Sequence, residues 1–328
     1  DDEIKGEANS INYKFRMHDP RVGRFFAVDP LASRFSYNSP YAFSENVVIN
    51  AVELEGLEAE IKKPTEGVFL IKLKNVDFNF LLRKSEEKLT ETIKRVDTKQ
   101  QDFAINTQMF DYASYLDYIA AGAPFASPRP ISDYTPQGFN IKNGKNLRGR
   151  SSDKTFYFSR SQDDCSWSCG FGNVPSDSNF GFGGGTPLIV DGLKYGTENI
   201  YKDDAPESVK KVGKIGNIPA ESLKYLKQKS NGVYSGQNTN TVGKTILGLN
   251  SKEGTWIIIS QQQGAEGYTL DQIRDALYDM GYDNVLGFDG STSSTLGIDG
   301  ETVVKPNRRK NNTTNTGVIL SVPTEEQK

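Results

Sequence analysis

The sequence predicts an α+β fold, with a core of twisted mixed or antiparallel β-sheet and flanking helices. Short apolar runs bounded by glycine, proline or asparagine recur along the chain, and such runs are typical of strands. Helical periodicity is confined to a few stretches, of which residues 269–281 are the clearest. A hydrophobic content of 36% and an aromatic content of 11% supply enough apolar surface for a packed core. The length of 328 residues allows roughly two domains.

The chain begins with a part that is rich in short strands and turns. Residues 11–57 interleave aromatic side chains with Asp-Pro and glycine turn signals. Residues 58–67 are polar, and we interpret them as a linker. The predicted organisation is therefore a first part over residues 1–57, the linker, and a main domain over residues 68–328.

The first half of the main domain contains strands, one helix and a long irregular stretch. Residues 68–74 alternate as a strand does, and residues 85–96 place apolar side chains on one helical face. An apolar run ends at Asn106. Residues 120–185 show no sustained period, so they predict loops that in part wall a binding site. Residues 183–192 predict a hairpin that turns at Asp-Gly.

The second half carries the strongest local signals. A short helix is predicted within residues 220–229, and residues 256–260 form a buried-type strand. Thr269 and Gln272 make a capping box for a helix that Gly281 closes. A strand over residues 285–288 follows, which places residues 255–300 in a strand–helix–strand–loop–strand arrangement. Asp299-Gly300 predicts a tight hairpin turn at the end of this stretch.

Charge and histidine content exclude several chemistries. Residues 1–57 hold nine acids and six bases, so 33 of each sign remain for residues 58–328, without the basic excess of a nucleic-acid binder. The single histidine, His18, lies outside the main domain, which excludes Ser-His-Asp catalysis and histidine-ligated zinc there. The basic cluster at Lys305 and residues 308–310 is interpreted as a solvated loop.

Two further features bear on compartment. Cys165 and Cys169 fit either a short-loop disulfide or two free thiols. No apolar run of ~18 residues exists, so no transmembrane segment is predicted. The N-terminal residues are not a signal peptide, so any export is expected to be directed from outside this chain.

The loop after residues 285–288 is the best candidate site. Asp289 leaves the end of an apolar strand, and Gly290 is followed by five consecutive hydroxyl residues, 291–295. A carboxylate at a strand end, beside N–H and O–H donors, suits acid–base chemistry on an anionic substrate. A plain polar turn between two strands explains the same residues.

Residues 11–57 resemble the conserved end of the RHS/YD-repeat shell that precedes the toxin of polymorphic toxin proteins. Matching residues lie at 16–19, 21–25, 29–30, 39–42 and 46. The resemblance implies a self-cleavage centre built on two Asp-Pro pairs. Asp29-Pro30 fits the first pair, whereas Glu53 stands where the second aspartate would be, which puts cleavage after Leu57 in doubt.

The main domain is similar to the phosphodiester glycosidase family. Gly-Gly-Gly-Thr-Pro-Leu-Ile-Val-Asp-Gly (183–192), Gly-Tyr-Thr-Leu (267–270) and Gly-Phe-Asp-Gly-Ser-Thr-Ser-Ser-Thr (287–295) occur in the family's order. The similarity covers about residues 68–322, with a final strand near 317–322. This chain departs from two glycine motifs of the family, at residues 106–108 and 289–292. The larger polar residues there indicate a different substrate, or a loss of glycosidase activity with the fold retained.

The family resemblance implies hydrolysis at the anomeric carbon of a sugar-1-phosphodiester. A carboxylate near that carbon would stabilise an oxocarbenium-like transition state, and donors around the phosphate would supply the larger electrostatic effect. Asp289 is the candidate base or nucleophile, Asn106 would orient the substrate, and other carboxylates are candidates for a second acid. The candidate set comprises catalytic Asp289, Asn106, Asp111 and Glu266, and substrate- or phosphate-binding Thr292, Ser293, Ser294, Lys244, Arg309 and Gln108. A turn-capping Asn106 and solvated Lys244 and Arg309 are the structural alternatives.

Three functional classes remain open. The first is a secreted antibacterial effector, delivered into the periplasm or cytoplasm of a target cell, that hydrolyses a glycosyl phosphodiester. The second is a toxin on the same scaffold that cleaves a nucleotide or nucleic acid, which near-neutral charge disfavours. The third is a non-catalytic carbohydrate- or partner-binding module. The expected partners are a cognate immunity protein, the RHS shell and its secretion machinery, and a glycosyl-phosphate substrate; no cofactor is implied, and a divalent cation stays open.

Overall fold

The structure is a computed structural model that describes most of the main domain and three short strands before it. The described residues are 11–12, 17–19, 24–25, 59–96, 98, 100–107, 109–110, 136–150, 156–172, 174–175, 177–210, 220–231, 234–314 and 316–323. In this part of the chain no helix has the length and apolar character that crossing a bilayer would need.

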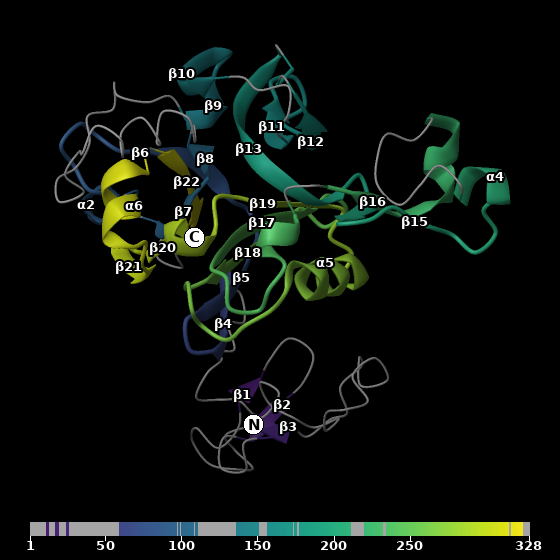
Figure 1. Ribbon diagram of the computed structural model, residues 1–328. Coiled ribbons are helices and arrows are strands. Elements are labelled where there is room, and N and C mark those ends of the chain that lie inside the picture. Colours follow the sequence, from purple (N-terminus) through teal and green to yellow (C-terminus); the bar gives the residue numbers. More distant parts are fainter. Residues whose placement is uncertain are drawn as a thin grey trace.

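A large sheet forms the centre of the molecule (Figure 1). Its main path runs β15-β16-β14-β13-β19-β17-β18-β5-β4, and further strands branch from β13. Among the described strands of this sheet, β14 pairs with β16 in parallel and the other pairs are antiparallel. Its strands are β4 (Ala59–Thr65), β5 (Val68–Leu73), β8 (Met109–Phe110), β9 (Pro136–Lys142), β10 (Lys145–Arg150), β11 (Phe156–Ser161), β12 (Trp167–Phe171), β13 (Ser178–Val190), β14 (Leu193–Gly196), β15 (Ile200–Tyr201), β16 (Leu226–Ser230), β17 (Lys244–Asn250), β18 (Thr255–Gln261) and β19 (Asn284–Gly287).

A smaller antiparallel sheet packs against the large one. It has the order β21-β20-β7-β22-β6, from β6 (Asp77–Leu82), β7 (Gln101–Asn106), β20 (Leu296–Ile298), β21 (Glu301–Val304) and β22 (Thr316–Val322). A separate small sheet pairs β1 (Ile11–Asn12), β2 (Met17–Asp19) and β3 (Arg24–Phe25). The helices and helical turns are α2 (Leu89–Lys94), α4 (Glu207–Lys210), η4 (Ala220–Tyr225), η5 (Ser235–Gln237), α5 (Leu270–Asp279), η6 (Ser291–Ser293) and α6 (Arg308–Thr313).

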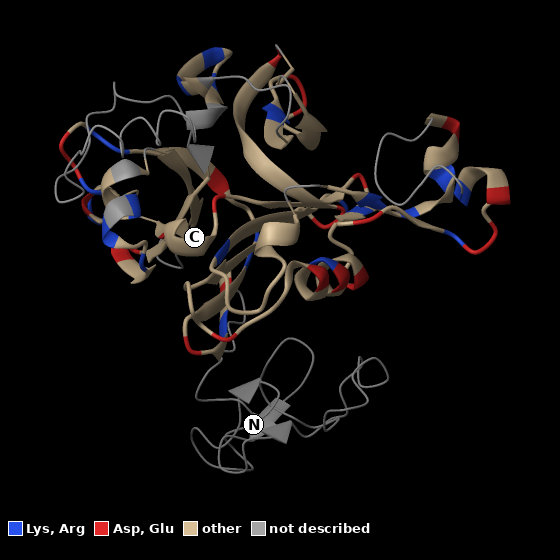
Figure 2. Cartoon of the chain, viewed as in Figure 1, with Lys and Arg blue, Asp and Glu red and all other residues tan. Residues whose placement is uncertain are grey.

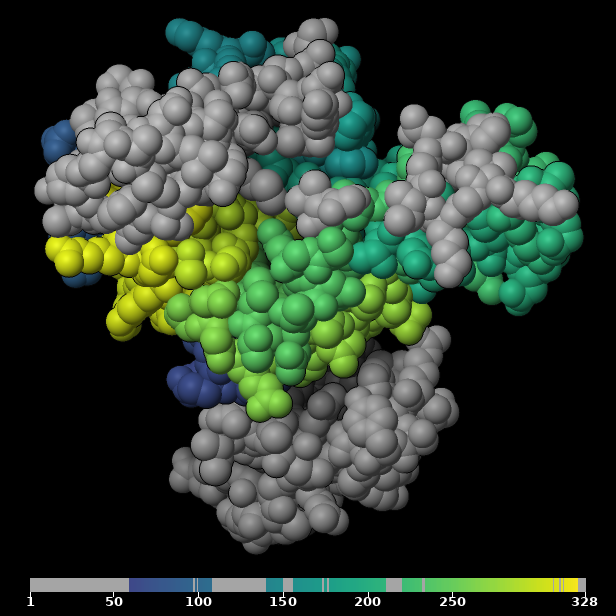
Figure 3. Space-filling model, viewed as in Figure 1, coloured from purple at the N-terminus to yellow at the C-terminus, as the bar shows by residue number. Residues whose placement is uncertain are grey.

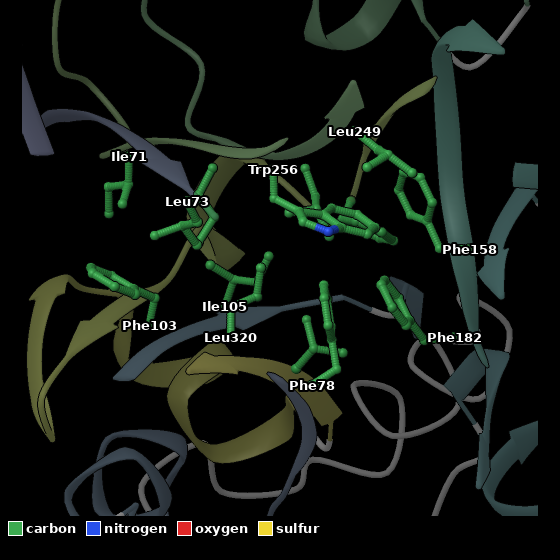
Figure 4. Close-up of a cluster of buried hydrophobic side chains, with 14 of the residues drawn as sticks. Ile71, Leu73, Phe78, Phe103, Ile105, Phe158, Phe182, Leu249, Trp256 and Leu320 are labelled. Carbon is green, nitrogen blue, oxygen red and sulfur yellow. The ribbon is translucent and has the colours of Figure 1, made fainter. Parts of the chain in front are cut away.

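The main hydrophobic core lies between the two sheets, and Figure 4 shows part of it. Ile71 and Leu249 belong to the large sheet, whereas Phe103 and Leu320 belong to the small one, and all four are at most 3% exposed. Trp256 of β18 stacks edge-on against rings from several strands, including Phe78 at 4.8 Å between ring centroids. Such aromatic pairs add to the stabilisation from buried area.

Two smaller cores complete a helix–sheet–sheet–helix layering. Ile273 and Leu277 of α5 pack on the outer face of the large sheet, against Ile257 and neighbouring residues. Leu89 and Ile93 of α2 pack on the outer face of the small sheet. The site residues described below lie where strands of both sheets end, next to α6.

The predicted strands and turns of the second half are confirmed. Helix α5 has both hydrogen bonds of the Thr269–Gln272 capping box, and β18, β19 and β22 occupy the predicted segments. The hairpins that turn at residues 191–192 and 299–300 are both present. Helix α2 is shorter than predicted, and residues 220–229 form η4 and β16 instead of one helix.

Two predictions about loops are wrong. Residues 120–185, predicted as loops, contain β9 to β12 and most of β13. Their glycines and aromatic residues pair across strands, so that Trp167 reaches within 4.4 Å of Phe78 on the other sheet, between ring centroids. The predicted linker over residues 58–67 holds β4, which pairs with β5 from Ala59 opposite Leu73. Polar side chains suit β4 because it is the outermost strand of this path.

The surface features of the described residues agree with near-neutral charge. Figure 2 shows acidic and basic residues interspersed along the ribbon instead of gathered on one basic face. Residues around β15, β16 and α4 project as an arm on one side of the body (Figures 1 and 3). Cys165 and Cys169 are both free, the first exposed and the second buried, which decides between the two alternatives left open by the sequence. Burial raises the pKa of the Cys169 thiol.

Candidate functional site

The site is built on the loop that leaves β19. Leu286 and Phe288 anchor this segment in the main core, and the Phe288 amide donates to the Thr245 carbonyl at 2.8 Å. Asp289 follows directly, and the chain then turns through η6. Ser291 in that turn has φ 54°, a left-handed conformation that is uncommon for residues other than glycine. The well-packed strand thus presents a carboxylate at the start of a tight polar turn.

Asn106, at the end of β7, holds this loop in place through hydrogen bonds. Its amide nitrogen donates to the Asp289 carbonyl at 2.6 Å. Its amide oxygen accepts from the Thr245 hydroxyl at 2.9 Å and from the Thr295 amide at 3.0 Å. Asn106 is 0% exposed, and these bonds hold the Asp289 loop. The structure therefore indicates a positioning role for Asn106 toward this loop, and orientation of substrate by Asn106 stays a prediction.

The loop before β17 packs closely against the same turn. Ser291 donates its amide to the Gly243 carbonyl at 2.7 Å. A side chain at Gly243 would collide with the Ser291 carbonyl and the Ser294 hydroxyl, so glycine permits this approach. The Gln237 side chain lies beside Gly290, where an added Cβ would come within 3.3 Å of its amide oxygen. Gln237 is thus a neighbour of the carboxylate that sequence reasoning missed.

Asp289 has a basic partner from a different element. The Lys310 ammonium on α6 lies 3.5 Å from Asp289 Oδ2, and the two side chains are 7% and 17% exposed, respectively. Burial raises the pKa of the Asp289 carboxyl, while Lys310 and the Ser293 hydroxyl oppose that rise. A carboxyl with a raised pKa in a largely enclosed position is typical of groups that exchange protons in a reaction.

Two hydroxyls of the Asp289 loop lack hydrogen-bond partners among the described residues. The Ser293 and Ser294 side chains are at most 1% exposed, and neither hydroxyl completes a hydrogen bond with the described residues. The Ser293 hydroxyl is near enough to affect Asp289 but lacks good hydrogen-bond geometry toward it. Buried hydroxyls are normally satisfied, so unpartnered ones here mark donors available to a bound molecule. Thr292, also predicted, lies in η6 and is partly exposed.

Lys244 does not lie where a phosphate would meet it. Its ammonium donates to the carbonyls of Thr239 and Val242 at 2.6 and 2.7 Å, and the residue is 1% exposed. Desolvation lowers its pKa to about 8. Strand alternation explains the position, because the next residue, Thr245, faces Asn106 and Lys244 therefore faces the opposite side. The predicted phosphate contact by Lys244 is corrected to a clamp on the loop over residues 239–242.

Glu266 is the one remaining candidate whose side chain the structure describes. Glu266 is exposed, and its carbonyl accepts from the Thr65 hydroxyl of β4 at 2.9 Å. Arg309 belongs to α6, but its side chain lies outside the described residues. Four further candidates lie wholly outside the described residues: Asp111, Gln108, Asp29 and Glu53.

Lys310 is a neighbour of Asp289 that sequence reasoning passed over. The cluster at residues 305–310 was interpreted as a solvated loop, yet α6 buries one of its members. An Asn at position 307 followed by Lys310 is a capping signal that could have revealed the helix, because the Asn307 side chain accepts from the Lys310 amide at 2.8 Å. The site therefore combines one enclosed carboxylate, one ammonium and two unpartnered hydroxyls. Among the described residues, no three His, Cys, Asp or Glu side chains gather as metal ligands.

Comparison with known proteins places this arrangement in a family. The phosphodiester glycosidase family matches residues 101–321, more than half of the chain. The catalytic domain of a zebrafish N-acetylglucosamine-1-phosphodiester alpha-N-acetylglucosaminidase, auto-inhibited by its pro-peptide, is similar at 16% identity over 81% of this chain and 78% of that chain, with a TM-score of 0.44.

Two further solved structures are similar over most of this chain. A hypothetical protein from Synechocystis shares 12% identity over 83% of this chain and 61% of that one, with a TM-score of 0.38. An exported protein from Burkholderia pseudomallei shares 12% identity over 81% and 74%, with a TM-score of 0.41. No curated protein matches the chain significantly.

Proposed function

The chain belongs to the phosphodiester glycosidase family and is a hydrolase of that type, and we propose that Asp289 is the carboxylate with which it cleaves a sugar-1-phosphate linkage. The substrate class that fits is a glycosyl phosphodiester, such as a lipid-linked or nucleotide-linked sugar or a cell-envelope polymer.

One observation carries the assignment to this loop. Asp289 is enclosed, its pKa is raised by burial, the Ser293 hydroxyl lies near it, and the hydroxyls of Ser293 and of Ser294 in the same loop are unpartnered. Buried hydroxyls are usually satisfied. An anionic ligand with several oxygen acceptors beside the carboxylate would satisfy these two.

The reaction needs a group that reacts at the anomeric carbon and a group that stabilises the departing phosphate. Water or the Asp289 carboxylate forms the new bond to the anomeric carbon, and the electron pair of the broken C–O bond leaves with the phosphate monoester. If water attacks, the ionised carboxylate accepts its proton. If Asp289 attacks, water then hydrolyses the bond between the sugar and the carboxylate, which releases the sugar and restores Asp289. Phosphate is already a good leaving group, so donors to its oxygens supply the larger electrostatic effect, and Ser293 and Ser294 are in place for that role.

Incubation of the purified chain with nucleotide sugars and synthetic glycosyl phosphodiesters tests this function. Mass spectrometry should detect free sugar and a phosphate monoester in equal amounts. A protein with Asp289→Asn is the matched control, because the side chain keeps its shape and loses its charge. Absence of both products across all substrates, with a folded wild-type protein, would contradict the proposal.

We further propose that this hydrolase is the toxin of a secreted antibacterial effector. The support is the resemblance of residues 11–57 to the end of an RHS/YD-repeat shell, which precedes a toxic domain. On this proposal β4 begins the toxic domain at Ala59, the shell and its secretion machinery deliver it to a target cell, and a cognate immunity protein protects the producer. Glu53 in place of aspartate should make cleavage after Leu57 slow, which mass spectrometry of a longer chain would measure.

Expression of the chain inside a bacterium tests the toxin role separately from the enzymatic one. Wild-type protein without an immunity protein should stop growth in the cytoplasm, the periplasm or both, and Asp289→Asn should not. Normal growth in both compartments, from protein that hydrolyses a glycosyl phosphodiester in vitro, would contradict the toxin proposal and leave the hydrolase intact.

A further inference from the structure

Lys310 supplies a positive charge inside the candidate site from an element that is remote in sequence from Asp289. Its side chain is only 7% exposed, and its ammonium lies 3.5 Å from Asp289 Oδ2. Lysine is seldom so fully buried without a specific partner.

Helix α6 holds the backbone of Lys310 in a fixed place. The Asn307 side chain accepts from the Lys310 amide at 2.8 Å, and the Asn307 amide donates to the Thr292 carbonyl at 2.9 Å. On the other side, the Asn311 side chain exchanges two hydrogen bonds with Thr90 of α2, at 2.9 and 3.1 Å. Asn307 therefore joins the backbone of η6 to the backbone of Lys310.

The geometry of the pair differs from that of a structural ion pair. A charge-assisted N–H···O contact is usually about 2.7–2.9 Å long, and the Lys310–Asp289 contact is longer. A buried ion pair contributes little to stability unless its geometry is excellent. The long contact is therefore not optimised as an ion pair, and the unpartnered Ser293 hydroxyl lies near the same carboxylate.

We propose that Lys310 is a further catalytic residue, whose ammonium binds the phosphate of the substrate and stabilises the charge that develops on it. This inference rests on the proposed cleavage of a glycosyl phosphodiester. The diester carries one negative charge, and breaking the bond to the anomeric carbon moves an electron pair onto the departing oxygen. Lys310, Ser293 and Ser294 then face that phosphate, and Asp289 faces the anomeric carbon.

The same ammonium favours the ionised form of Asp289. Burial raises the pKa of this carboxyl, and Lys310 is the charged group that lowers it in part. Other basic groups on neighbouring elements face elsewhere: Lys244 of β17 donates to backbone carbonyls, and Arg308 of α6 is exposed. The Arg309 side chain lies outside the described residues. Loss of Lys310 should therefore raise the pKa of Asp289 further.

Steady-state kinetics of Lys310→Met and Lys310→Arg test the proposal on the full chain. Lys310→Met should lower kcat/KM about 10²- to 10³-fold, as loss of a donor to a developing anion does, and move the acid limb of the pH–rate profile to higher pH. Lys310→Arg should recover much of the loss. Lys305→Met is the matched control, because Lys305 is an exposed lysine in the same basic cluster and should leave both quantities unchanged.

Binding of methyl phosphate provides a readout that does not require turnover. Asp289→Asn should bind it, and the double variant Asp289→Asn/Lys310→Met, which removes both charges together, should bind it at least tenfold more weakly. Equal binding by these two proteins would overturn the proposal. Hydrolysis by Lys310→Met at the wild-type rate, with an unshifted acid limb of the pH–rate profile, would also overturn it. Absence of hydrolysis in the wild type contradicts the proposed function instead, and the binding comparison still decides the role of Lys310.

Discussion

Two ionic clusters, each with a buried basic side chain, lie in different layers of the molecule, and their polar atoms differ in how fully they are hydrogen-bonded. On α5, Arg274 donates to Asp271 at 2.6 Å, to both oxygens of Asp275 at 2.9 and 3.0 Å, and to the Tyr195 carbonyl at 2.8 Å. Tyr234 and Asn238 complete the bonding of Asp271. At the Asp289 loop the ion pair is 3.5 Å long, and neighbouring hydroxyls are unpartnered.

The α5 cluster is a polar cluster that stabilises the fold, whereas the Asp289 cluster contains hydroxyls that are available to a bound molecule. The α5 cluster joins a helix to β14 with short bonds, so its free energy is already gained in the folded protein. In the Asp289 cluster, the Ser293 and Ser294 hydroxyls make no hydrogen bond with the described residues. Substitutions in the first cluster should therefore lower stability with activity retained, and substitutions in the second should do the reverse.

The largest expected effect is on activity, at Asp289. Asp289→Asn removes the charge and the proton acceptor, so kcat should fall about 10²- to 10⁴-fold. Because asparagine caps turns nearly as well, the melting temperature should change little. Kinetics and thermal unfolding of the same preparation measure both quantities. Wild-type kcat from this variant would show that the loop is an ordinary turn.

The opposite result is expected at Arg274. Arg274→Met keeps much of the apolar stem and removes hydrogen bonds to two acids and a carbonyl, which should lower the free energy of unfolding by about 2 kcal/mol. Asp271 and Asp275 are nearly half exposed, so water solvates them after the change and limits the loss. Urea unfolding measures it, and kcat of the folded protein should be unchanged. A loss of kcat without a loss of stability would reverse the roles of the two clusters.

Glu87 on the segment before α2 sharpens the comparison, because its pKa moves opposite to that of Asp289. Hydrogen bonds from Arg95, each 3.0 Å long, are the main cause that lowers the Glu87 pKa from 4.5 to about 2. A depressed folded-state pKa stabilises the protein above pH 4.5, and this stabilisation is lost as pH falls toward about 2.

Between those pH values the free energy of unfolding should fall by about 1–2 kcal/mol as pH decreases, after allowance for solvent screening of the half-exposed Arg95. Glu87→Gln should remove this part of the pH dependence. The acid limb of activity should be unaffected by that substitution, because it reflects Asp289. A shift of the limb in Glu87→Gln would mean that the limb reports unfolding.

The smallest expected effect is at Ser294. Ser294→Ala removes one unpartnered hydroxyl and should lower kcat/KM about tenfold, with stability unchanged or slightly higher because a buried unsatisfied group is lost. Ser260→Ala is the matched control, since its hydroxyl is also buried and unpartnered but belongs to the strand β18. Equal kinetic effects of the two substitutions would remove the distinction between the Asp289 loop and the rest of the core.

Local signals explain which elements the sequence could predict. The capping box of Thr269 and Gln272, the strand that ends in Asp289 and the turn at residues 299–300 each lie within a few residues, and all appear as predicted. Strands β9 to β12 and the first part of β13 were missed because their glycine-rich, aromatic segments are stabilised by partners elsewhere, such as Phe78 and Trp256.

The same reasoning applies to the site. Asp289, Ser293 and Ser294 adjoin one another in the sequence, so their association was predictable, although their roles stay predictions. Lys310 was not predictable, because its burial depends on the docking of α6 against Thr292 and Thr90. Lys244 has a suitable charge, but strand alternation turns it toward backbone carbonyls, a detail of register that composition does not show.

Hydrolysis in ¹⁸O-labelled water tests the central claim most directly, because it identifies which bond breaks. A glycosyl phosphodiester that the wild-type chain cleaves should yield sugar with ¹⁸O at the anomeric carbon and an unlabelled phosphate monoester. Asp289→Asn should reduce formation of that labelled sugar about 10²- to 10⁴-fold. Label in the phosphate would show attack at phosphorus, and would contradict a glycosidase built around Asp289.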